Sequence, residues 1–241
     1  MIKHHLAKLR LRHEISAAEE AGIYAALGEV RSFGPREIVV RAETLLTHST
    51  LLLDGMMCRF KDLKSGERQI AELHIAGDFV DLHSFVLQRL DHEIMAIKRC
   101  QAVFVPHDRL RHLTETFPHL ARVYWFSTAL DAAIHREWVL SLGRRSALAR
   151  LAALFCELRV RLEIVGMAER SGFVLPLNQM ELAECMGLTT VHVNRTLRDL
   201  REASLLTFRN KRVEIHDLPG LEKIAEFDPF YLYPGRQPPL D

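Results

Sequence analysis

The chain has 241 residues, of which 48% are hydrophobic and 26% are charged; this composition excludes disordered and collagen-like proteins and fits one large domain or two modest ones. Its 32 basic and 31 acidic residues leave a net charge of +1, so the overall charge indicates no particular partner. The sequence contains no apolar run of the ~18 residues that a membrane span needs, and its first 14 residues lack the apolar core of a secretory signal. We therefore expect a soluble, cytoplasmic protein.

The four cysteines predict neither disulfides nor a metal site. Cys58, Cys100, Cys156 and Cys185 are widely spaced and form no C-x-x-C pair. Such spacing is atypical of a disulfide framework or a zinc site. We expect four buried thiols and no bound metal.

The first third of the chain is predicted to be mainly β structure. Short apolar runs at 37–41, 51–53, 56–60 and 70–75 are separated by turn residues, and a further strand pair is expected at 93–97 and 102–105. Gly55, Gly66 and Gly77 recur every eleven residues, and glycine supplies the positive φ of tight turns. Evenly spaced turns between short strands predict a barrel or rolled sheet.

A long helix is predicted from Pro118 to Leu142, which contains no glycine and no further proline. Two opposite sides of this helix are apolar, one of them with Trp125, Phe126 and Ala129, so the helix needs two partners. A second copy of the same helix is the simplest choice, and burial in one large core is the alternative. The residues predicted to share the dimer face are Leu120, Val123, Ser127, Leu130, Ile134 and Trp138.

Glycine at position 143 predicts an interruption of the helix at 142–145, which would act as a hinge between two domains. Another helix is expected at 147–164. The segment 166–172 is predicted to be a loop, and 228–241, with four prolines, an irregular tail.

Residues 177–200 carry the motif with the clearest functional meaning. Asn178 followed three residues later by Glu181 is the pattern of a capping box that begins a helix. Gly187 permits the left-handed turn that ends it, and Thr189 can cap a second helix. Two short helices around a glycine turn predict a helix-turn-helix; an incidental helical hairpin is the alternative.

The outer side of the second helix carries the predicted DNA contacts. Arg195 is the foremost base-reading candidate, because its guanidinium fits O6 and N7 of guanine together. Two predicted strands around a tight turn at 209–212 form a wing that contacts phosphates or, alternatively, an ordinary solvated turn. The predicted base-reading residues are Thr190, Val191, His192, Asn194 and Arg195. The predicted phosphate contacts are Thr189, Arg198, Arg209, Lys211 and Arg212.

The chain resembles the Crp/Fnr family, the cyclic-AMP receptor protein superfamily of bacterial transcription regulators, over nearly its whole length. The sharpest matches are 75–80, which is similar to the family's strand-turn segment beside the effector pocket, and 187–197, where Arg195 matches the base-reading arginine. The resemblance implies an α+β fold, a homodimer on palindromic DNA, and contact with RNA polymerase through 166–172. The implied domains are a sensor β-roll with N-terminal helices (1–117), a dimerisation helix and hinge (118–143), and a winged helix-turn-helix with a C-terminal tail (144–241).

Departures from the family pattern predict a degenerate effector pocket. Members that bind cyclic nucleotides carry an Arg-Ser or Arg-Thr pair, whereas 91–95 here reads Asp-His-Glu-Ile-Met, and Asp78 replaces the usual glutamate. A carboxylate at position 93 would repel a phosphate instead of clamping it, so we expect no cyclic AMP binding. In the recognition helix, Val191 replaces a frequent glutamate and could contact only a thymine methyl. The predicted pocket residues are Gly77, Asp78, Phe79, His92 and Glu93.

The sequence does not identify the effector. An iron-sulfur cluster is not expected, because no cysteine precedes Cys58. Haem, an unidentified small molecule and no effector at all remain alternatives; the candidate haem ligands are His48, His74, His83 and His92. The sequence lacks the common catalytic motifs and predicts no enzyme. The alternative function is a small-molecule- or haem-binding regulatory module whose helix-turn-helix serves protein contacts.

Overall fold

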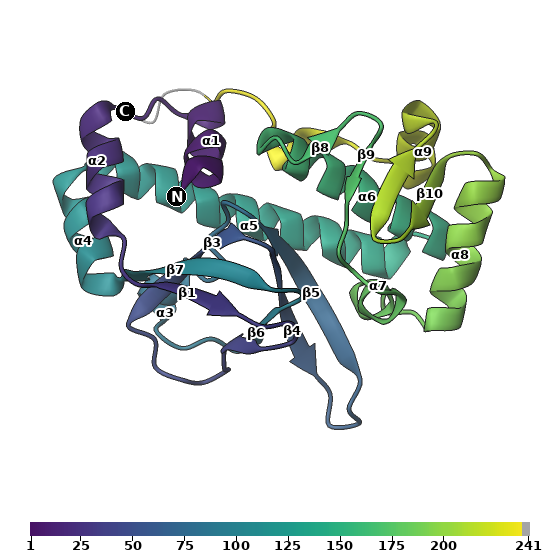
Figure 1. Cartoon of the computed structure of the whole chain (residues 1–241), viewed down its shortest axis with the longest axis horizontal. Coiled ribbons are helices and arrows are strands. Elements are labelled where there is room, and N and C mark those ends of the chain that lie inside the picture. The colour runs from purple at the N-terminus through teal and green to yellow at the C-terminus, as the bar shows by residue number, and fades with distance from the viewer. Residues whose placement is uncertain (238–241) are drawn as a thin grey trace. The chain divides into compact units, whose positions relative to one another are not determined.

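The computed structural model describes residues 1–237. Clustering of contacts divides the chain into two compact units (Figure 1). The first comprises 1–60, 73–132 and the chain from residue 233, and the second comprises 61–72 and 133–232. Three of the boundaries fall inside elements, so the strands at 56–62 and 68–75 and the helix at 118–144 each contribute to both units.

The strands between residues 30 and 106 form two antiparallel sheets, as predicted for a rolled sheet. The turns at Gly55 and Gly77 have φ of 100° and 91°, which glycine adopts without strain. One sheet has the order β1-β7-β3 and consists of β1 (Val30–Phe33), β7 (Cys100–Pro106) and β3 (His48–Asp54). The other has the order β2-β6-β4-β5 and consists of β2 (Ile38–Val40), β6 (Glu93–Ala96), β4 (Met56–Asp62) and β5 (Arg68–Ile75).

Four helices accompany the roll in the first unit. A reciprocal capping box between Ser16 and Glu19 begins α2. Leu6 and Leu9 of α1, Ile23 of α2 and apolar residues of α4 and α5 share one buried cluster with β3 and β7. These helices are α1 (Lys3–Arg12), α2 (Ala17–Ala26), α3 (Ser84–Leu87) and α4 (His107–Thr116).

Helix α5 (Pro118–Arg144) is continuous through Gly143, so the predicted interruption at 142–145 is misplaced. The break lies immediately beyond, where the Ser146 hydroxyl accepts a hydrogen bond from the Ala149 N–H at 3.2 Å and begins α6 (Ala147–Ile164). A single glycine in an exposed helix costs only about 1 kcal/mol relative to alanine. Twenty-five helical residues precede Gly143 in α5, which begins at Pro118, and their cooperative helix formation offsets that cost.

Helix α6 is the central element of the second unit, and its residues from Leu151 to Leu162 are all buried. The sheet beside it has the order β10-β11-β9-β8. Its strands are β8 (Ala168–Glu169), β9 (Gly172–Val174), β10 (Leu206–Arg209) and β11 (Arg212–Ile215). The helices are α7 (Gln179–Met186), α8 (Thr190–Glu202), α9 (Leu218–Ala225) and the 3-10 helix η1 (Pro229–Leu232).

Two segments expected to be irregular have regular structure. The predicted loop 166–172 is a hairpin, in which Ala168 pairs with Phe173. Gly172 is needed in this hairpin because a Cβ there would lie 2.1 Å from the Val213 carbonyl oxygen of β11. In the predicted tail, η1 buries Leu232, and 238–241 lie outside the described residues. Among residues 1–237, none of the helices has the length and apolar character to cross a membrane.

Candidate nucleic-acid interface and sensor segment

The helix-turn-helix forms as its sequence predicts. The Asn178 side chain accepts from the Glu181 N–H at 2.9 Å, and the Glu181 carboxylate accepts from the Asn178 N–H at 2.7 Å. Gly187 ends α7 in the left-handed conformation, with φ of 60°. The Thr189 hydroxyl then accepts from the His192 N–H at 3.2 Å and begins α8. Each start and stop signal is local, which is why the sequence predicts this element to the residue.

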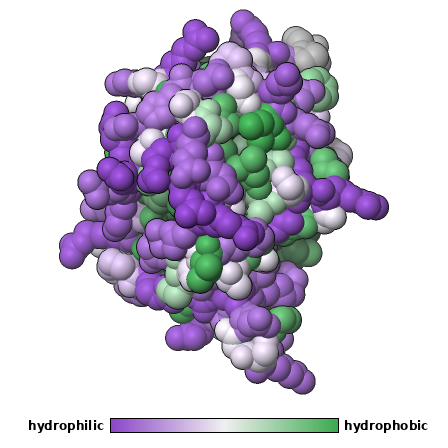
Figure 2. All heavy atoms as spheres, turned by 90° about the vertical axis from the view of Figure 1, so that its right-hand side faces the viewer, coloured by the Kyte–Doolittle hydropathy of each residue, from purple (hydrophilic) through white to green (hydrophobic). Residues whose placement is uncertain are grey.

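Helix α8 has one buried side and one exposed side. Val193, Thr196 and Leu200 are buried against the rest of the second unit. The His192 side chain is partly buried, at the edge between the two sides. Figure 2 views the molecule from the side on which α8 lies in Figure 1, and that face is mostly hydrophilic with smaller hydrophobic areas. The exposed predicted contacts on α8 are Thr190, Val191, Asn194, Arg195 and Arg198.

The wing, formed by β10, β11 and the turn 209–212, closes through a two-residue turn. Asn210 and Lys211 both have positive φ, of 49° and 61°, as a type I′ hairpin turn requires. Arg209 and Arg212 face each other across the hairpin, and both are exposed, as is Lys211. The wing therefore presents three cations at one tip of the second unit.

Two of the exposed arginines on α8 and the wing have acidic neighbours. Arg198 lies 3.9 Å from the Glu202 carboxylate, and Arg212 lies 3.9 Å from that of Glu214, with all four side chains more than half exposed. Exposed ion pairs at this distance contribute little and exchange readily. Both arginines can therefore turn to a phosphate at small cost.

Sequence reasoning missed Arg150, which holds the helix-turn-helix to the end of α5. Its guanidinium donates to the carbonyl oxygens of Ser141 at 3.2 Å, Leu142 at 2.9 Å and Arg145 at 3.3 Å, and also to that of Met186. The carbonyls of a helix C-terminus lack partners within the helix, so Arg150 satisfies groups at the ends of both α5 and α7. An arginine among alanines and leucines carries no sequence signal for this role.

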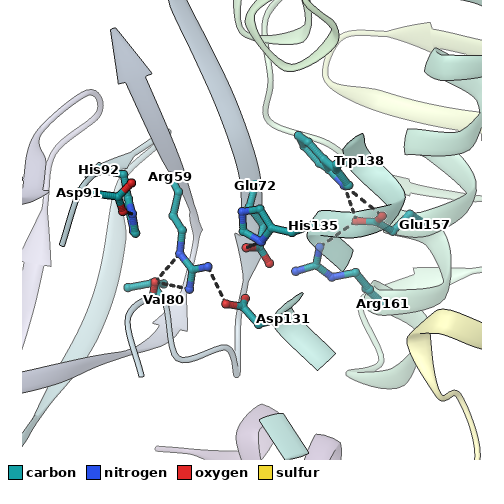
Figure 3. A network of polar contacts seen from close by, with 10 residues as sticks. All are labelled: Arg59, Glu72, Val80, Asp91, His92, Asp131, His135, Trp138, Glu157 and Arg161. Atoms are coloured by element: carbon teal, nitrogen blue, oxygen red, sulfur yellow. Dashed lines mark hydrogen bonds and ion pairs between the residues drawn. The ribbon is translucent and has the colours of Figure 1, made fainter. Parts of the chain in front are cut away.

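A buried carboxylate joins three elements of the second unit. Glu157 of α6, 2% exposed, accepts from the Trp138 indole N–H at 3.1 Å, the Arg161 guanidinium at 2.9 Å and the Tyr231 hydroxyl at 3.0 Å (Figure 3). Burial and the neighbouring carboxylate raise the pKa of Tyr231 above its usual range, so it remains a donor. Arg161 lies one helical turn from Glu157, but no pattern in the sequence pairs Glu157 with Trp138 or Tyr231, which are 19 and 74 residues away.

The exposed face of α5 is not the predicted dimer face. Leu120, Val123, Ile134 and Trp138 are buried within the protomer, and Ser127 and Leu130 are partly buried. A side chain buried in its own protomer has no surface for a partner, so these four residues are corrected to core packing, and only Ser127 and Leu130 keep some exposed surface. Both sides of the helix are apolar, and only the fold shows which one packs inside. The residues turned outward are Trp125, Ala129, Ala132, Arg136 and Val139.

Residues 75–81, here called the sensor segment, carry three of the predicted pocket residues beneath α1. The Asp78 carboxylate pairs with Lys8 and accepts from the Ile75 N–H at 2.9 Å. The Gly77 carbonyl accepts from His5 Nδ1 at 3.0 Å. Burial lowers the pKa of His5 to about 4, so its imidazole is neutral near pH 7. The Phe79 ring packs edge-on against His5, with 5.3 Å between ring centroids.

The other two predicted pocket residues have different partners. His92 Nδ1 lies 3.0 Å from the Asp91 carboxylate, and its ring lies 5.4 Å from that of His83. Glu93 begins β6, with its carboxylate 4.0 Å from the Arg41 guanidinium. The five residues predicted to line one pocket thus fall into two groups.

Asp81, at the end of the sensor segment, is fully buried. Its carboxylate accepts from the Thr50 backbone N–H and from the Thr50 hydroxyl, the latter at 3.1 Å. Burial raises the pKa of Asp81 to about 7, against the opposing effects of Thr50 and of the Arg59 charge. The sensor segment therefore contains a buried carboxyl group whose pKa lies well above the usual range of aspartate.

The other candidate ligands are largely internal. All four cysteines are buried, and burial raises the pKa of Cys156 to about 12, which disfavours the thiolate that a metal needs. His74 is 1% exposed. His48 packs on Phe104, with ring centroids 4.1 Å apart, and burial lowers its pKa.

Comparisons with known proteins agree with this architecture. Residues 30–117 match the model of the cyclic nucleotide-binding domain, and 149–224 match that of the Crp-like helix-turn-helix domain. A "probable transcriptional activator" of Rhizobium leguminosarum bv. viciae is 29% identical over 189 residues, 78% of this chain and 77% of that protein. Nitrogen fixation regulation protein FixK of Bradyrhizobium diazoefficiens is 27% identical over 213 residues, 86% of each. The structure of FixK2 from Bradyrhizobium japonicum shares the fold, with a TM-score of 0.75 and 22% identity over 83% of this chain and 98% of that one.

A roll of the cyclic nucleotide-binding type, followed along the chain by a Crp-like helix-turn-helix, defines a DNA-binding transcription regulator. The chain belongs to the Crp/Fnr family of transcription regulators, whose members are not enzymes. The predicted fold class is confirmed.

Proposed function

We propose that this protein is a homodimeric, sequence-specific transcription activator that binds a palindromic site without cyclic AMP. The observation that carries the proposal is the exposed side of α8. Thr190, Val191, Asn194 and Arg195 project from a helix whose opposite side is fixed by Val193 and Leu200. A rigid helix with exposed polar groups in its first turns is what major-groove readout requires.

The outward stripe of α5 supports the dimer. Trp125 and Val139 are 75% and 70% exposed, and they lie on one line of the helix with Ala129 and Ala132. The line follows the alternating spacing of four and three residues that a coiled-coil seam uses. A twofold axis lets the same stripe serve both copies, and the alanines allow close approach of the two helices.

The DNA contacts follow from the positions on α8 and the wing. Arg195 reads guanine through O6 and N7, and Val191, 77% exposed, contacts a thymine methyl. Lys211 at the wing tip contacts a phosphate and fixes the register without reading sequence. Two copies related by a twofold axis would occupy major grooves about 34 Å apart, and the site would be palindromic.

The sensor would not take cyclic AMP. A cyclic phosphate needs a cation, and residues 91–95 place the Glu93 carboxylate there by family resemblance. Asp78, in the place of the usual glutamate, is already paired with Lys8. A nucleotide would have to break that ion pair and accept the repulsion of Glu93.

Activation would use the hairpin at 166–172. It projects Met167 and Arg170, which are both exposed, at the position where activators of the family contact RNA polymerase. The relative from Rhizobium leguminosarum is itself called a transcriptional activator. The hairpin gives this surface a defined shape, since β8 and β9 are paired.

DNA selection with the purified, ligand-free protein tests the proposal. We expect enrichment of a palindrome whose half-site centres lie about one helical turn apart, together with a dimeric mass in sedimentation equilibrium. Adding cyclic AMP should change nothing. Enrichment of no sequence, with or without cyclic AMP, would contradict the proposal and favour a regulatory module that contacts proteins.

A further inference from the structure

Arg59 connects the sensor segment to the long helix inside the first unit. It lies on β4 and is 3% exposed. Its Nε and Nη2 atoms donate to the Val80 carbonyl oxygen at 2.9 and 2.7 Å, and Nη1 donates to the Asp131 carboxylate of α5 at 2.6 Å (Figure 3). One side chain therefore bridges the backbone of the sensor segment and the helix that carries the outward stripe.

The chemistry of this bridge requires arginine. A guanidinium is costly to remove from water unless its donors are paired, and here the planar fork reaches a carbonyl on one side and a carboxylate on the other. Lysine has a single ammonium centre and cannot span both acceptors in this way. The arrangement is thus specific to this side chain.

The rest of the sensor segment is held by other parts of the same unit. The Val80 N–H donates to the Thr50 carbonyl at 2.9 Å, and the Asp78 carbonyl accepts from the Leu52 N–H at 2.9 Å. Gly77 lies so close to α1 that a Cβ would be 2.7 Å from the His4 carbonyl carbon. Strand β3, helix α1 and Arg59 together hold the segment.

We propose that Arg59 is a built-in ligand of the sensor: its guanidinium joins the sensor segment to α5 and thereby holds the DNA-binding arrangement of the dimer with no external effector. The inference rests on the proposed function. An effector shifts an equilibrium only through contacts that differ between two states. A cation supplied by the chain makes such contacts permanently, and its removal should create a site for a guanidinium ion.

Chemical rescue tests the inference. Arg59→Ala leaves the Val80 carbonyl and Asp131 facing a guanidinium-sized gap. We expect its affinity for the selected palindrome, measured by fluorescence anisotropy, to fall at least tenfold while the dimer mass is unchanged. Methylguanidinium at low millimolar concentration, against sodium chloride at equal ionic strength, should restore most of the loss. Arg59→Lys should bind as weakly as Arg59→Ala. Arg31→Ala is the control: the Arg31 side chain is 53% exposed and pairs with Glu29 at the surface, so this variant should bind like the wild type.

Asp131→Asn gives a second route if Arg59→Ala does not fold. It weakens one end of the bridge while Arg59 keeps the Val80 carbonyl, and we expect a smaller loss of affinity, about threefold to tenfold, without rescue by methylguanidinium. Wild-type affinity in both Arg59→Ala and Asp131→Asn would overturn the inference, as would a loss that methylguanidinium leaves unchanged in folded Arg59→Ala. A wild-type protein that prefers no DNA sequence would instead refute the proposed function.

Discussion

Helix α8 and the sensor segment place polar side chains in opposite settings. On α8, Asn194 and Arg195 are exposed, whereas in the sensor segment Asp78 is paired with Lys8 and Asp81 with Thr50. Groups that face solvent keep their hydrogen-bonding capacity for a partner, but groups satisfied inside must first lose the bonds they have. The contrast teaches that α8 has polar groups available to a partner, while those of the sensor segment serve the protein's own internal connections.

The largest effect should come from separating the two copies of α8. We expect Ala132→Glu to abolish dimers, because it places two like charges across the twofold axis of the stripe. Loss of one half-site per complex should weaken specific DNA binding by at least about 10³-fold, the usual gap between specific and non-specific affinity. Sedimentation equilibrium and anisotropy measure the two effects. Arg111→Glu, at an exposed position of α4, is the control and should remain dimeric. A dimeric Ala132→Glu protein would refute this interface.

Removing the base-reading side chain should have the next largest effect. Arg195→Ala loses a bidentate guanine contact worth about 1–3 kcal/mol in each half-site, so we expect discrimination between the palindrome and random DNA to vanish. Competition anisotropy measures it. Arg201→Ala, exposed near the other end of α8, should keep the discrimination. If Arg195→Ala kept it as well, another residue would be the reader.

The buried Asp81 should make stability depend on pH. Because its pKa is raised from 3.8 to about 7 in the folded protein, its contribution is complete below about pH 4 and is lost as the pH rises through 7. Asp81→Asn lacks this loss and should gain up to about 4 kcal/mol over the wild type between pH 4 and 8. Urea unfolding of both proteins at several pH values measures the difference.

Comparing the wild type with Asp81→Asn also removes the opposing pH dependence that His5 contributes to stability. His5, with its pKa lowered to about 4, stabilises the fold above about pH 6.5 and loses this contribution as the pH falls through 4. Both proteins contain His5, so its effect cancels in the difference. A difference that stays constant with pH would show that Asp81 is charged throughout.

The smallest effect should come from the wing. Lys211→Ala removes one exposed cation from its tip, so we expect slightly weaker binding to every DNA sequence alike. The slope of log affinity against log salt should fall by about one for each wing that loses its phosphate contact. Titrations at several salt concentrations measure it. A loss confined to the palindrome would show that Lys211 reads bases.

Local signals account for what could be predicted from the sequence. The capping box at Asn178 and the glycine at 187 act within a few residues, and so did the turn glycines of the roll; these positions were predicted accurately. Arg59 and Asp131 are 72 residues apart, and no pattern within one segment pairs them. The prediction of the dimer face was wrong for a related reason. Both sides of α5 are apolar, and only packing against the roll determines that Val123 is buried and Trp125 is exposed.

The same limit applies to the hairpin at 166–172. The sequence predicts a loop there, whereas the segment is a hairpin in which Gly172 admits the Val213 carbonyl of a strand 40 residues further on. Residues whose partners are distant in sequence, such as Arg150 and Glu157, left no signal in composition or spacing. The sequence therefore predicts the helix-turn-helix well and the internal connections poorly.

The central claim is that the ligand-free dimer reads two half-sites through α8. Fluorescence anisotropy at physiological salt tests it, with the selected palindrome compared with the same duplex carrying one scrambled half-site. We expect a Kd of roughly 10⁻⁸ M or tighter for the intact palindrome and at least tenfold weaker binding when one half-site is scrambled. Equal, salt-sensitive binding to both duplexes would contradict the account.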